Sequence, residues 1–276
     1  MNPERSVERI PHTKSIWLTY HDVYHVEPLP GVPRYAAMYH VSKHTFTQHL
    51  STILSLGRRL MTVSDFFQYK TNDSVILTFD DGWKGAFEIA LPILQKFGLK
   101  ATFFITRDFV GRAGFCDHEL ILQAAQAGME IGVHGTTHRM LSSCTREEMI
   151  WEFSACKAFL ESLLGKQVES ASMPGGDWNP KIVSCAKEAG LQSLCTSRPG
   201  INNTRVSPFN LRRVTIRDTT SDGDIQRYCR YHIQKEWLRW AALQAPCRLL
   251  GKRNYSRVRQ WLLDTQKSRG DDLFTP

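Results

Sequence analysis

The run Ser74-Val75-Ile76-Leu77-Thr78-Phe79 is almost unbroken in its apolar character and ends at Asp80-Asp81-Gly82. Its length and its branched and aromatic residues are typical of a strand that is buried on both faces, as in a parallel sheet. Further along the chain, residues 86–97 have helical spacing and end at Gly98, and residues 101–105 form another apolar run. This succession predicts a strand, helix and strand unit with parallel strands.

The same alternation continues on both sides of this unit. The other predicted strands are residues 15–20, 130–133, 170–173, 193–196 and 211–216, and the other predicted helices are residues 45–56, 119–127, 146–164 and 180–189, each followed by a glycine. Such a pattern favours a parallel sheet covered by helices, either doubly wound or closed as a barrel. In both architectures, reactive side chains lie at the carboxyl ends of the strands.

The composition is that of an ordinary globular protein. The 276 residues are 42% hydrophobic and 22% charged, which excludes long disordered or collagen-like regions. The sequence has no apolar run of the roughly 18 to 20 residues that a membrane helix needs and no signal segment, so we expect a cytoplasmic protein. The seven cysteines form no CxxC pair, which argues against disulfides and against a thiolate zinc site.

The net charge of +8 is concentrated near the C-terminus. From Arg227 onward there are 11 Lys and Arg against 4 Asp and Glu, which leaves 24 against 23 in the rest of the chain. We predict a barrel unit over residues 1–220 and a basic helical extension over residues 221–276, with a second helix at 255–263. The extension either packs on the barrel with its arginines in solvent or makes peripheral contact with the inner membrane, and we expect no nucleic-acid partner.

Two adjacent carboxylates, Asp80 and Asp81, follow the central strand directly. Adjacent side chains at a strand end point in different directions, so one carboxylate can bind a cation while the other faces a reacting water. The alternative is a simple turn or a helix N-cap, where Asp and Gly are also common.

A pair of histidines follows the strand at residues 130–133. In His134-Gly135-Thr136-Thr137-His138 the two imidazoles are four residues apart, and they converge if the segment makes a helical turn. Structural or surface roles are the alternative. With a nearby carboxylate, the pair suits Zn²⁺ or another borderline divalent ion and leaves positions open for water and substrate.

These two motifs resemble those of the polysaccharide deacetylase family, which is carbohydrate esterase family 4 or the chitooligosaccharide deacetylase homology domain. Residues 78–82 are similar to its first motif and residues 134–138 to its second, and the likeness extends over about residues 15–218. The resemblance implies a distorted (β/α) barrel of seven strands, to which the C-terminal helices are added. It also implies a metal-dependent hydrolase that removes N-acyl groups from sugars.

By this resemblance, Asp80 is the catalytic base, and Asp81, His134 and His138 hold a divalent metal, most simply Zn²⁺. The chemistry agrees with the assignment, since a metal lowers the pKa of bound water and polarises an amide carbonyl. A carboxylate next to it can accept the proton of the attacking water.

The third motif departs from the common form of the family. Pro174 and Gly175 are candidate substrate residues, and the Gly175 N–H is a candidate oxyanion donor. The family usually has an arginine two residues before this proline, where this chain has Ser172. Arg213 either replaces that arginine as the partner of Asp80 or forms an unrelated structural salt bridge.

The general acid of the family is a histidine after a late strand, but only His232 follows His138, and it falls in a predicted helix. The segment 17–22 resembles the missing motif moved to the front of the chain, which makes His21 the candidate acid. Because the first and last strands of a closed barrel are neighbours, this permutation leaves the pocket unchanged. A structural role beside Asp22 is the alternative. We interpret the other early histidines as surface or hydrogen-bonded residues: His25, His40, His44 and His49.

The sequence therefore predicts metal-dependent hydrolysis that releases acetate or formate from an N-acylated amino sugar or glycoconjugate. Without an export signal, a cytoplasmic biosynthetic intermediate is the expected substrate. Two alternatives remain. One is an amidohydrolase that acts on a non-sugar amide, and the other is a catalytically silent glycan-binding or membrane-adaptor module, suggested by the altered third motif.

Overall fold

The central run of the sequence forms strand β5 (Ser74–Phe79), which lies inside a strongly curved sheet that is parallel except for the strand β10. The computed structural model describes residues 14–28, 32, 34–69 and 73–242. Along the sheet the strand order is β10-β1-β5-β6-β7-β8-β9, while β11 pairs with β1 and β4 with β5. The other strands of this sheet are β1 (Ser15–Tyr20), β4 (Arg59–Met61), β6 (Thr102–Ile105), β7 (Glu130–Val133), β8 (Ser170–Ser172), β9 (Ser193–Cys195), β10 (Ile201–Asn202) and β11 (Val214–Thr215).

The segment that carries β11 connects the two edges of the sheet. β11 pairs in parallel with β1, and Leu211, just before it, forms a parallel bridge to Cys195 in β9. The backbone N–H of Leu211 donates to the carbonyl of Leu194 at 3.0 Å, and that of Thr196 donates to the carbonyl of Leu211 at 2.7 Å. In the described part of the chain, hydrogen bonds thus connect seven parallel strands in a ring, which confirms the predicted distorted barrel.

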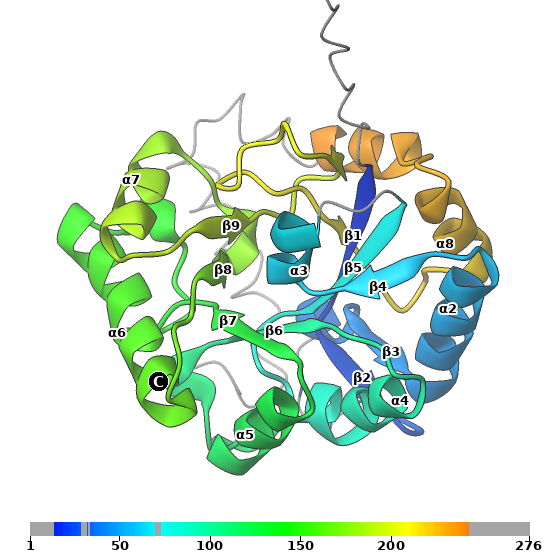
Figure 1. The fold of residues 1–276 in the computed structure, drawn as a ribbon, viewed down its shortest axis with the longest axis horizontal. Coiled ribbons are helices and arrows are strands. Elements are labelled where there is room, and N and C mark those ends of the chain that lie inside the picture. The colour runs from blue at the N-terminus through cyan, green and yellow to red at the C-terminus, as the bar shows by residue number, and fades with distance from the viewer. Residues whose placement is uncertain (1–13, 29–31, 33, 70–72, 243–276) are drawn as a thin grey trace, which may run out of the picture.

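Helices surround the curved sheet (Figure 1). They are α2 (Lys43–Ser55), α3 (Val63–Tyr69), the π-helical turn η1 (Ala86–Ala90) with α4 (Leu91–Lys96), α5 (His118–Gln126), α6 (Arg146–Leu164), α7 (Pro180–Glu188) and α8 (Asp222–Cys229). The longest, α6, begins at a capping box of Thr145 and Glu148 and ends at Gly165, whose φ of 66° lies in the left-handed region that glycine adopts most easily.

Alternate side chains of each strand point to the helices or into the ring. The outward residues of β1, such as Ile16 and Leu18, join the large hydrophobic cluster under the helices. The inward residues in the middle of the strands form a separate buried cluster that includes Trp17, Ile76 and Phe104. Toward the carboxyl ends the inward residues become polar, so the interior has an apolar floor below a polar site.

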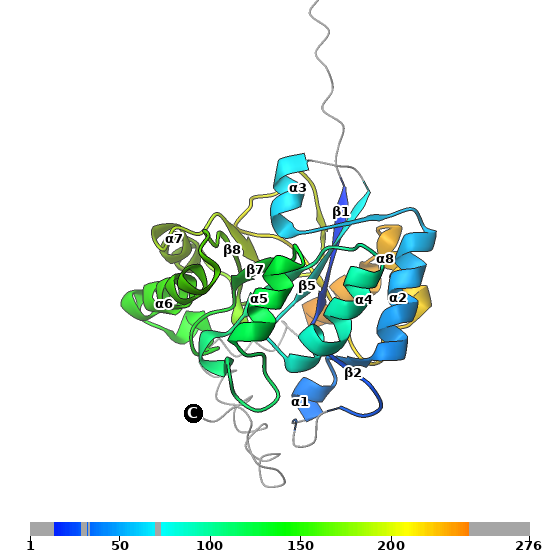
Figure 2. The same ribbon diagram turned by 60° about the horizontal axis from the view of Figure 1, so that its bottom comes forward.

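The sequence did not predict the shortest helices and strands. The strand predicted at 211–216 is paired only at Val214–Thr215 and through the bridge at Leu211. The stretch between the strand predicted at 15–20 and the helix predicted at 45–56, for which the sequence predicts no element, contains β2 (Asp22–Tyr24), α1 (Arg34–Ala37) and β3 (His40–Ser42). Figure 2 shows β2 and α1 on the lower side of the molecule, where the carboxyl end of β1 also lies.

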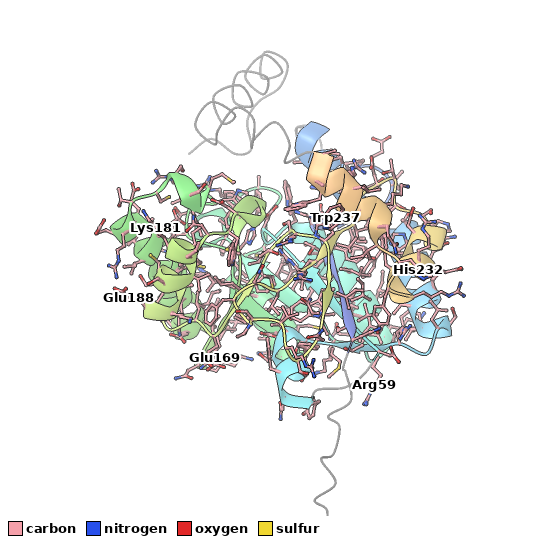
Figure 3. The ribbon with its side chains drawn as sticks, turned by 90° about the horizontal axis from the view of Figure 1, so that it is seen from above. Arg59, Glu169, Lys181, Glu188, His232 and Trp237 are labelled. Carbon is pink, nitrogen blue, oxygen red and sulfur yellow. The ribbon has the colours of Figure 1, made fainter. Side chains whose placement is uncertain are left out.

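The start of the predicted C-terminal extension is helical. After α8, residues 234–242 form a helix that carries Trp237 (Figure 3). Glu236 of this helix accepts a hydrogen bond from the Tyr228 hydroxyl at 2.9 Å. The helix predicted at 255–263 lies outside the described residues, and the boundary at residue 220 stays a prediction. Within the described residues, no helix has both the length and the hydropathy that crossing a membrane requires.

Candidate active site

Three side chains from two strand ends converge on one point. Asp81 follows β5, His134 follows β7, and His138 comes four residues later, and each offers a ligand atom within 4.8 Å of the others. The Nε2 atoms of both imidazoles lie 3.1 Å from Oδ1 of Asp81. Two imidazoles and a carboxylate are a donor set that suits a catalytic zinc or a similar divalent ion. By donor type and by mutual distance, these residues fit a metal.

The backbone at Asp81 is in a conformation that few residues with a side chain adopt. Its φ is 74°, in the left-handed region, and the φ of Gly82 is 91°. The carbonyl of Asp81 accepts a hydrogen bond from the N–H of Thr106 at 3.3 Å. The indole N–H of Trp83 donates to Oδ2 of Asp81 at 3.0 Å, which leaves Oδ1 for the histidines. Strained backbone of this kind is concentrated at functional sites.

The orientation of His134 is fixed by its second nitrogen. Nδ1 lies 3.0 Å from the backbone carbonyl of Ser172 in β8. Because a carbonyl only accepts, Nδ1 carries the proton and Nε2 is left with a lone pair toward Asp81. This is the arrangement that metal-binding histidines usually have.

Asp80 faces the opposite way and meets a buried arginine. Nη1 and Nη2 of Arg213 each lie 2.8 Å from one carboxylate oxygen of Asp80. The Ser172 hydroxyl donates to Oδ2 of Asp80 at 2.9 Å and accepts from Nη2 of Arg213 at 2.7 Å. Of the two roles that the sequence left open for Arg213, the structure shows the first, in which it is the partner of Asp80. The Ser172 hydroxyl is hydrogen-bonded to both residues.

Arg213 is held on all sides within the ring. It is completely buried, its Nε donates to the carbonyl of Thr196 at 3.0 Å, and its Nη1 also donates to the Thr78 hydroxyl at 3.0 Å. Burial, the largest single effect, raises the pKa of the Asp80 carboxyl, but the charges of Arg213 and His134 and the hydrogen bonds from Arg213 together outweigh it and hold that pKa below its ordinary value. Asp80 is thus ionised and free to accept a proton.

His21 follows β1 and lies beside the same cluster. Its ring stacks on Tyr39 with 4.9 Å between centroids, and its buried Nδ1 has no hydrogen-bond partner among the described residues. Burial lowers the pKa of His21 below its ordinary value, although the charges of Asp81 and Asp80 act in the opposite direction. His21 thus lies in the electrostatic field of both carboxylates.

The third motif lies against the loop of the second. Pro174 is buried, and its Cγ is 3.7 Å from the place where a Cβ on Gly135 would lie. Gly175 has a φ of 63°, and a Cβ there would come within 2.7 Å of the sulfur of Met140. The candidate oxyanion segment therefore borders the candidate metal ligands, and a side chain at Gly175 would displace the end of the Met140 side chain.

The remaining histidines fall into two groups. Four of the described ones are exposed, namely His25, His44, His118 and His232. His49 is buried and hydrogen-bonds through its ring to the Tyr20 hydroxyl at 3.0 Å, as predicted for a satisfied residue. His40 does not fit the prediction, because it is 1% exposed and neither ring nitrogen has a hydrogen-bond partner in the described chain. Its Nδ1 lies 3.6 Å from Asp22, opposite it on the paired strand β2.

Sequence reasoning missed two contacts of the site. Ser172 was read only as the residue that replaces an arginine, yet its hydroxyl bridges Asp80 and Arg213. The alternation of Ser170 and Ser172 along β8 could have indicated that both face inward. The bond from Trp83 to Asp81 had no such signal, because it depends on the turn after β5.

Comparison with known proteins agrees with this geometry. Residues 68–194 match the family model described as polysaccharide deacetylase. The Bacillus subtilis protein YxkH, whose name assigns it to the polysaccharide deacetylases, is 27% identical over 182 residues, which are 64% of this chain and 65% of that protein. The chain thus spans slightly less than two thirds of this relative.

A second relative carries a more specific name. The poly-β-1,6-N-acetyl-D-glucosamine N-deacetylase of Staphylococcus aureus is 24% identical over 215 residues, which are 70% of this chain and 73% of that protein. Among solved structures, the Streptococcus pyogenes deacetylase PplD in complex with acetate superposes with a TM-score of 0.71 and 21% identity, over 79% of this chain and 99% of that one. The structural likeness confirms the fold.

Proposed function

Because the chain belongs to the polysaccharide deacetylase family, we propose that it is a metal-dependent hydrolase that removes N-acyl groups from the N-acylated amino sugars of a glycan. One observation carries the proposal. An ionised carboxylate, Asp80, lies next in the chain to Asp81, whose oxygen is 3.1 Å from two imidazoles. A proton acceptor and a metal site are thus adjacent, as hydrolysis of an amide by water requires.

Asp81, His134 and His138 would hold the metal, for which the donor set favours Zn²⁺. When bound, such an ion makes water a stronger nucleophile at neutral pH and polarises the amide carbonyl. Trp83 and the carbonyl of Ser172 orient two of the three ligands from behind.

Asp80 acts as the general base in this proposal. Arg213 keeps its carboxylate ionised, and the two hydrogen bonds from the guanidinium fix its orientation. A base held in this way accepts the proton of the attacking water without rearrangement. The buried pair also removes the reason for reading the chain as a silent module, because the arginine missing at position 172 is replaced in space.

His21 and Gly175 complete the proposed machinery. The N–H of Gly175 would donate to the oxyanion that forms on the acyl carbon. His21 would give a proton to the departing amine, and the nearby charges of Asp81 and Asp80 offset part of the lowering of its pKa by burial. An amide needs this proton because a free amine anion is a very poor leaving group.

A pair of substrates tests the two proton-transfer roles. Asp80→Asn should abolish acetate release from an N-acetyl amide and also slow hydrolysis of 4-nitrophenyl acetate. His21→Asn should abolish only the amide reaction, since 4-nitrophenolate leaves without a proton. Equal losses of His21→Asn on both substrates would argue against its role as the acid, and full amide activity of Asp80→Asn would contradict the function itself.

The substrate class is the finer part of the proposal. The S. aureus relative is named for poly-β-1,6-N-acetyl-D-glucosamine, and we propose a polymer or oligomer of N-acetylated amino sugar for this chain. Acetate release should rise with the length of a β-1,6-linked N-acetylglucosamine oligomer. Greater activity on nucleotide-linked or lipid-linked N-acetyl sugars would instead support the cytoplasmic biosynthetic intermediate that the sequence suggested. Activity on formamides or cyclic imides alone would support the non-sugar amidohydrolase.

We also propose that helix 234–242 makes peripheral contact with an anionic membrane surface. Trp237 and Leu238 are 46% and 62% exposed, with the exposed cations Lys235 and Arg239 on the same short helix. Indole rings and cations are both favoured at a lipid headgroup layer. Binding to phosphatidylglycerol vesicles, weakened by Trp237→Ser with Leu238→Ser and absent with phosphatidylcholine, is the expected result. Cell fractionation would test the expected cytoplasmic location.

A further inference from the structure

A buried carboxylate stands behind the loop that joins the two candidate histidine ligands. Glu152, in the second turn of α6, is 1% exposed. Its Oε2 accepts hydrogen bonds from the backbone N–H groups of Thr136 and Thr137 at 2.7 and 2.9 Å. Its Oε1 accepts from the Thr137 hydroxyl. In the described part of the chain, no lysine, arginine or histidine forms an ion pair with Glu152.

The opposite side of the same loop is held by a different segment. The N–H of Arg107 donates to the carbonyl of Gly135 at 3.2 Å, and the N–H of Asp108 donates to the carbonyl of Thr136 at 2.9 Å. The Thr136 hydroxyl adds a bond to the backbone carbonyl of Glu152 at 3.0 Å. The loop is therefore held between α6 and the segment after β6. On the α6 side, three of the hydrogen bonds from the loop are accepted by the Glu152 carboxylate.

The loop needs such support because its conformation is unfavourable. Gly135 has a φ of 85° and His138, which has a side chain, a φ of 63°. A residue with a Cβ in the left-handed region persists only where its surroundings hold it there. A turn of this kind, and not a regular helix, is what brings His138 back toward Asp81, 3.1 Å away.

A purely structural role does not account for the residue type. Burying a carboxylate is costly unless it is well hydrogen-bonded, and a neutral residue could fill the same space at lower cost. Among the described residues, the hydrogen bonds of Glu152 outside its own helix go to the residues between His134 and His138 and to no other loop. The hydrogen bonds that offset the unfavourable burial of this carboxylate therefore also fix the positions of the two imidazoles.

We propose that Glu152 is a positioning residue for the metal site, which fixes the loop of residues 135–137 so that both imidazoles reach the ion that Asp81 also binds. The inference rests on the proposed function, because it takes the Asp81, His134 and His138 site to bind a metal. Glu152 itself is not a ligand, since its carboxylate oxygens are used by the loop.

The test is Zn²⁺ affinity of the full-length apoprotein, measured by competition with a chromogenic chelator, together with the visible absorption of the Co²⁺ form. Glu152→Ala removes the anchor. Glu152→Gln keeps one oxygen that can accept from both backbone N–H groups. Glu161→Ala is the matched control, because Glu161 lies on the same helix and accepts a loop N–H, that of Val168, at 3.0 Å. Melting in EDTA reports the fold of each variant.

We expect Glu152→Ala to weaken Zn²⁺ binding by about 10- to 100-fold and to change the Co²⁺ spectrum. Glu152→Gln should recover most of the affinity, and Glu161→Ala should lower the melting temperature without changing either metal readout. If Glu152→Ala does not fold, Glu152→Asp, whose shorter side chain withdraws the carboxylate from the loop, should show the same weakening.

Two results would overturn the inference while leaving the metal site intact. One is a folded Glu152→Ala protein with the affinity and Co²⁺ spectrum of the wild type, and the other is equal weakening by Glu161→Ala. A wild-type protein that binds no Zn²⁺, or His134→Ala with undiminished binding, would overturn the metal site itself and the inference with it.

Discussion

Arg213 and Asp80 form a completely buried, two-pronged ion pair, although they are 133 residues apart in the chain. The pair lies inside the ring, where the segment before β11 meets the end of β5. Closure of the ring is what brings the guanidinium to the carboxylate. The charge state of the proposed base thus depends on the architecture as a whole.

Two substitutions of Arg213 should distinguish the effect of its charge on Asp80 from the effect of its paired hydrogen bonds. Arg213→Met leaves a buried carboxylate without its partner, so we expect about 3–5 kcal/mol less stability in urea unfolding and a fall in kcat of about 100-fold or more. Arg213→Lys keeps the charge but loses the paired hydrogen bonds, so its stability and its kcat should lie between those of the wild type and those of Arg213→Met. Zn²⁺ affinity should change little in either variant. Undiminished kcat in a folded Arg213→Met protein would show that the pair is only structural.

The indole of Trp83 should strengthen metal binding through Asp81. Trp83→Phe keeps an aromatic ring but removes the N–H that bonds to Oδ2 of Asp81, and we expect Zn²⁺ affinity to fall by about 10-fold or more. Trp17→Phe is the matched control, because the buried N–H of Trp17 has no partner among the described residues. Equal affinities of the two variants would contradict the prediction.

Asp22 should make the stability of the apoprotein dependent on pH. Burial raises the pKa of this carboxyl from 3.8 to about 7. Between these two pH values the folded protein holds a proton on Asp22 that the unfolded chain releases. The contribution of Asp22 to the free energy of unfolding therefore decreases as pH rises from about 4 to 7 and no longer changes with pH above about 7. Asp22→Asn should therefore stabilise the protein by about 1–4 kcal/mol at pH 8, and by progressively less toward pH 5.

Urea unfolding in EDTA at both pH values measures this difference. Glu27→Gln, which changes an exposed carboxylate, is the control and should leave the profile unaltered. A stabilisation by Asp22→Asn that is the same at pH 5 and pH 8 would contradict the raised pKa.

Gly132 should be required for packing inside the ring. A Cβ at this position in β7 would lie 2.5 Å from the ring of Phe104 and 2.8 Å from the Ser170 hydroxyl. Gly132→Ala should therefore cost about 1–3 kcal/mol in thermal or urea unfolding. Gly223→Ala, where the nearest atom would be 3.7 Å away within α8, should be neutral or slightly stabilising. Stability losses of equal size would argue against the tight interior.

The parts of the fold that the sequence predicted are those with a strong local pattern. The strands at β5 and β7 and the helix α6 appear with the predicted bounds, because continuous apolar runs and helical spacing are decided locally. The sequence also predicted that Asp81, His134 and His138 lie close together, because the carboxyl ends of parallel strands share one edge of the sheet.

The rest depended on contacts across the chain. β2 and β3 have three residues each and pair only with each other, so no periodicity marks them. Whether Arg213 met Asp80 could not be decided from spacing, because it depends on which way the segment before β11 faces. Glu152 looked like any other acid on a helix, and only the packing of α6 on the loop distinguishes it.

The ring is closed by the short segment that carries Leu211 and β11, and this has a consequence for the order of events during translation. A nascent chain that has emerged from the ribosome only as far as β9 already contains Asp80, Asp81 and both histidines, but not Arg213, the cation that pairs with Asp80. His21, which follows β1, is the first residue of the proposed site to be synthesised, and Arg213 is the last. The proposed site is therefore completed late, when Arg213 has left the exit tunnel and β11 pairs with β1.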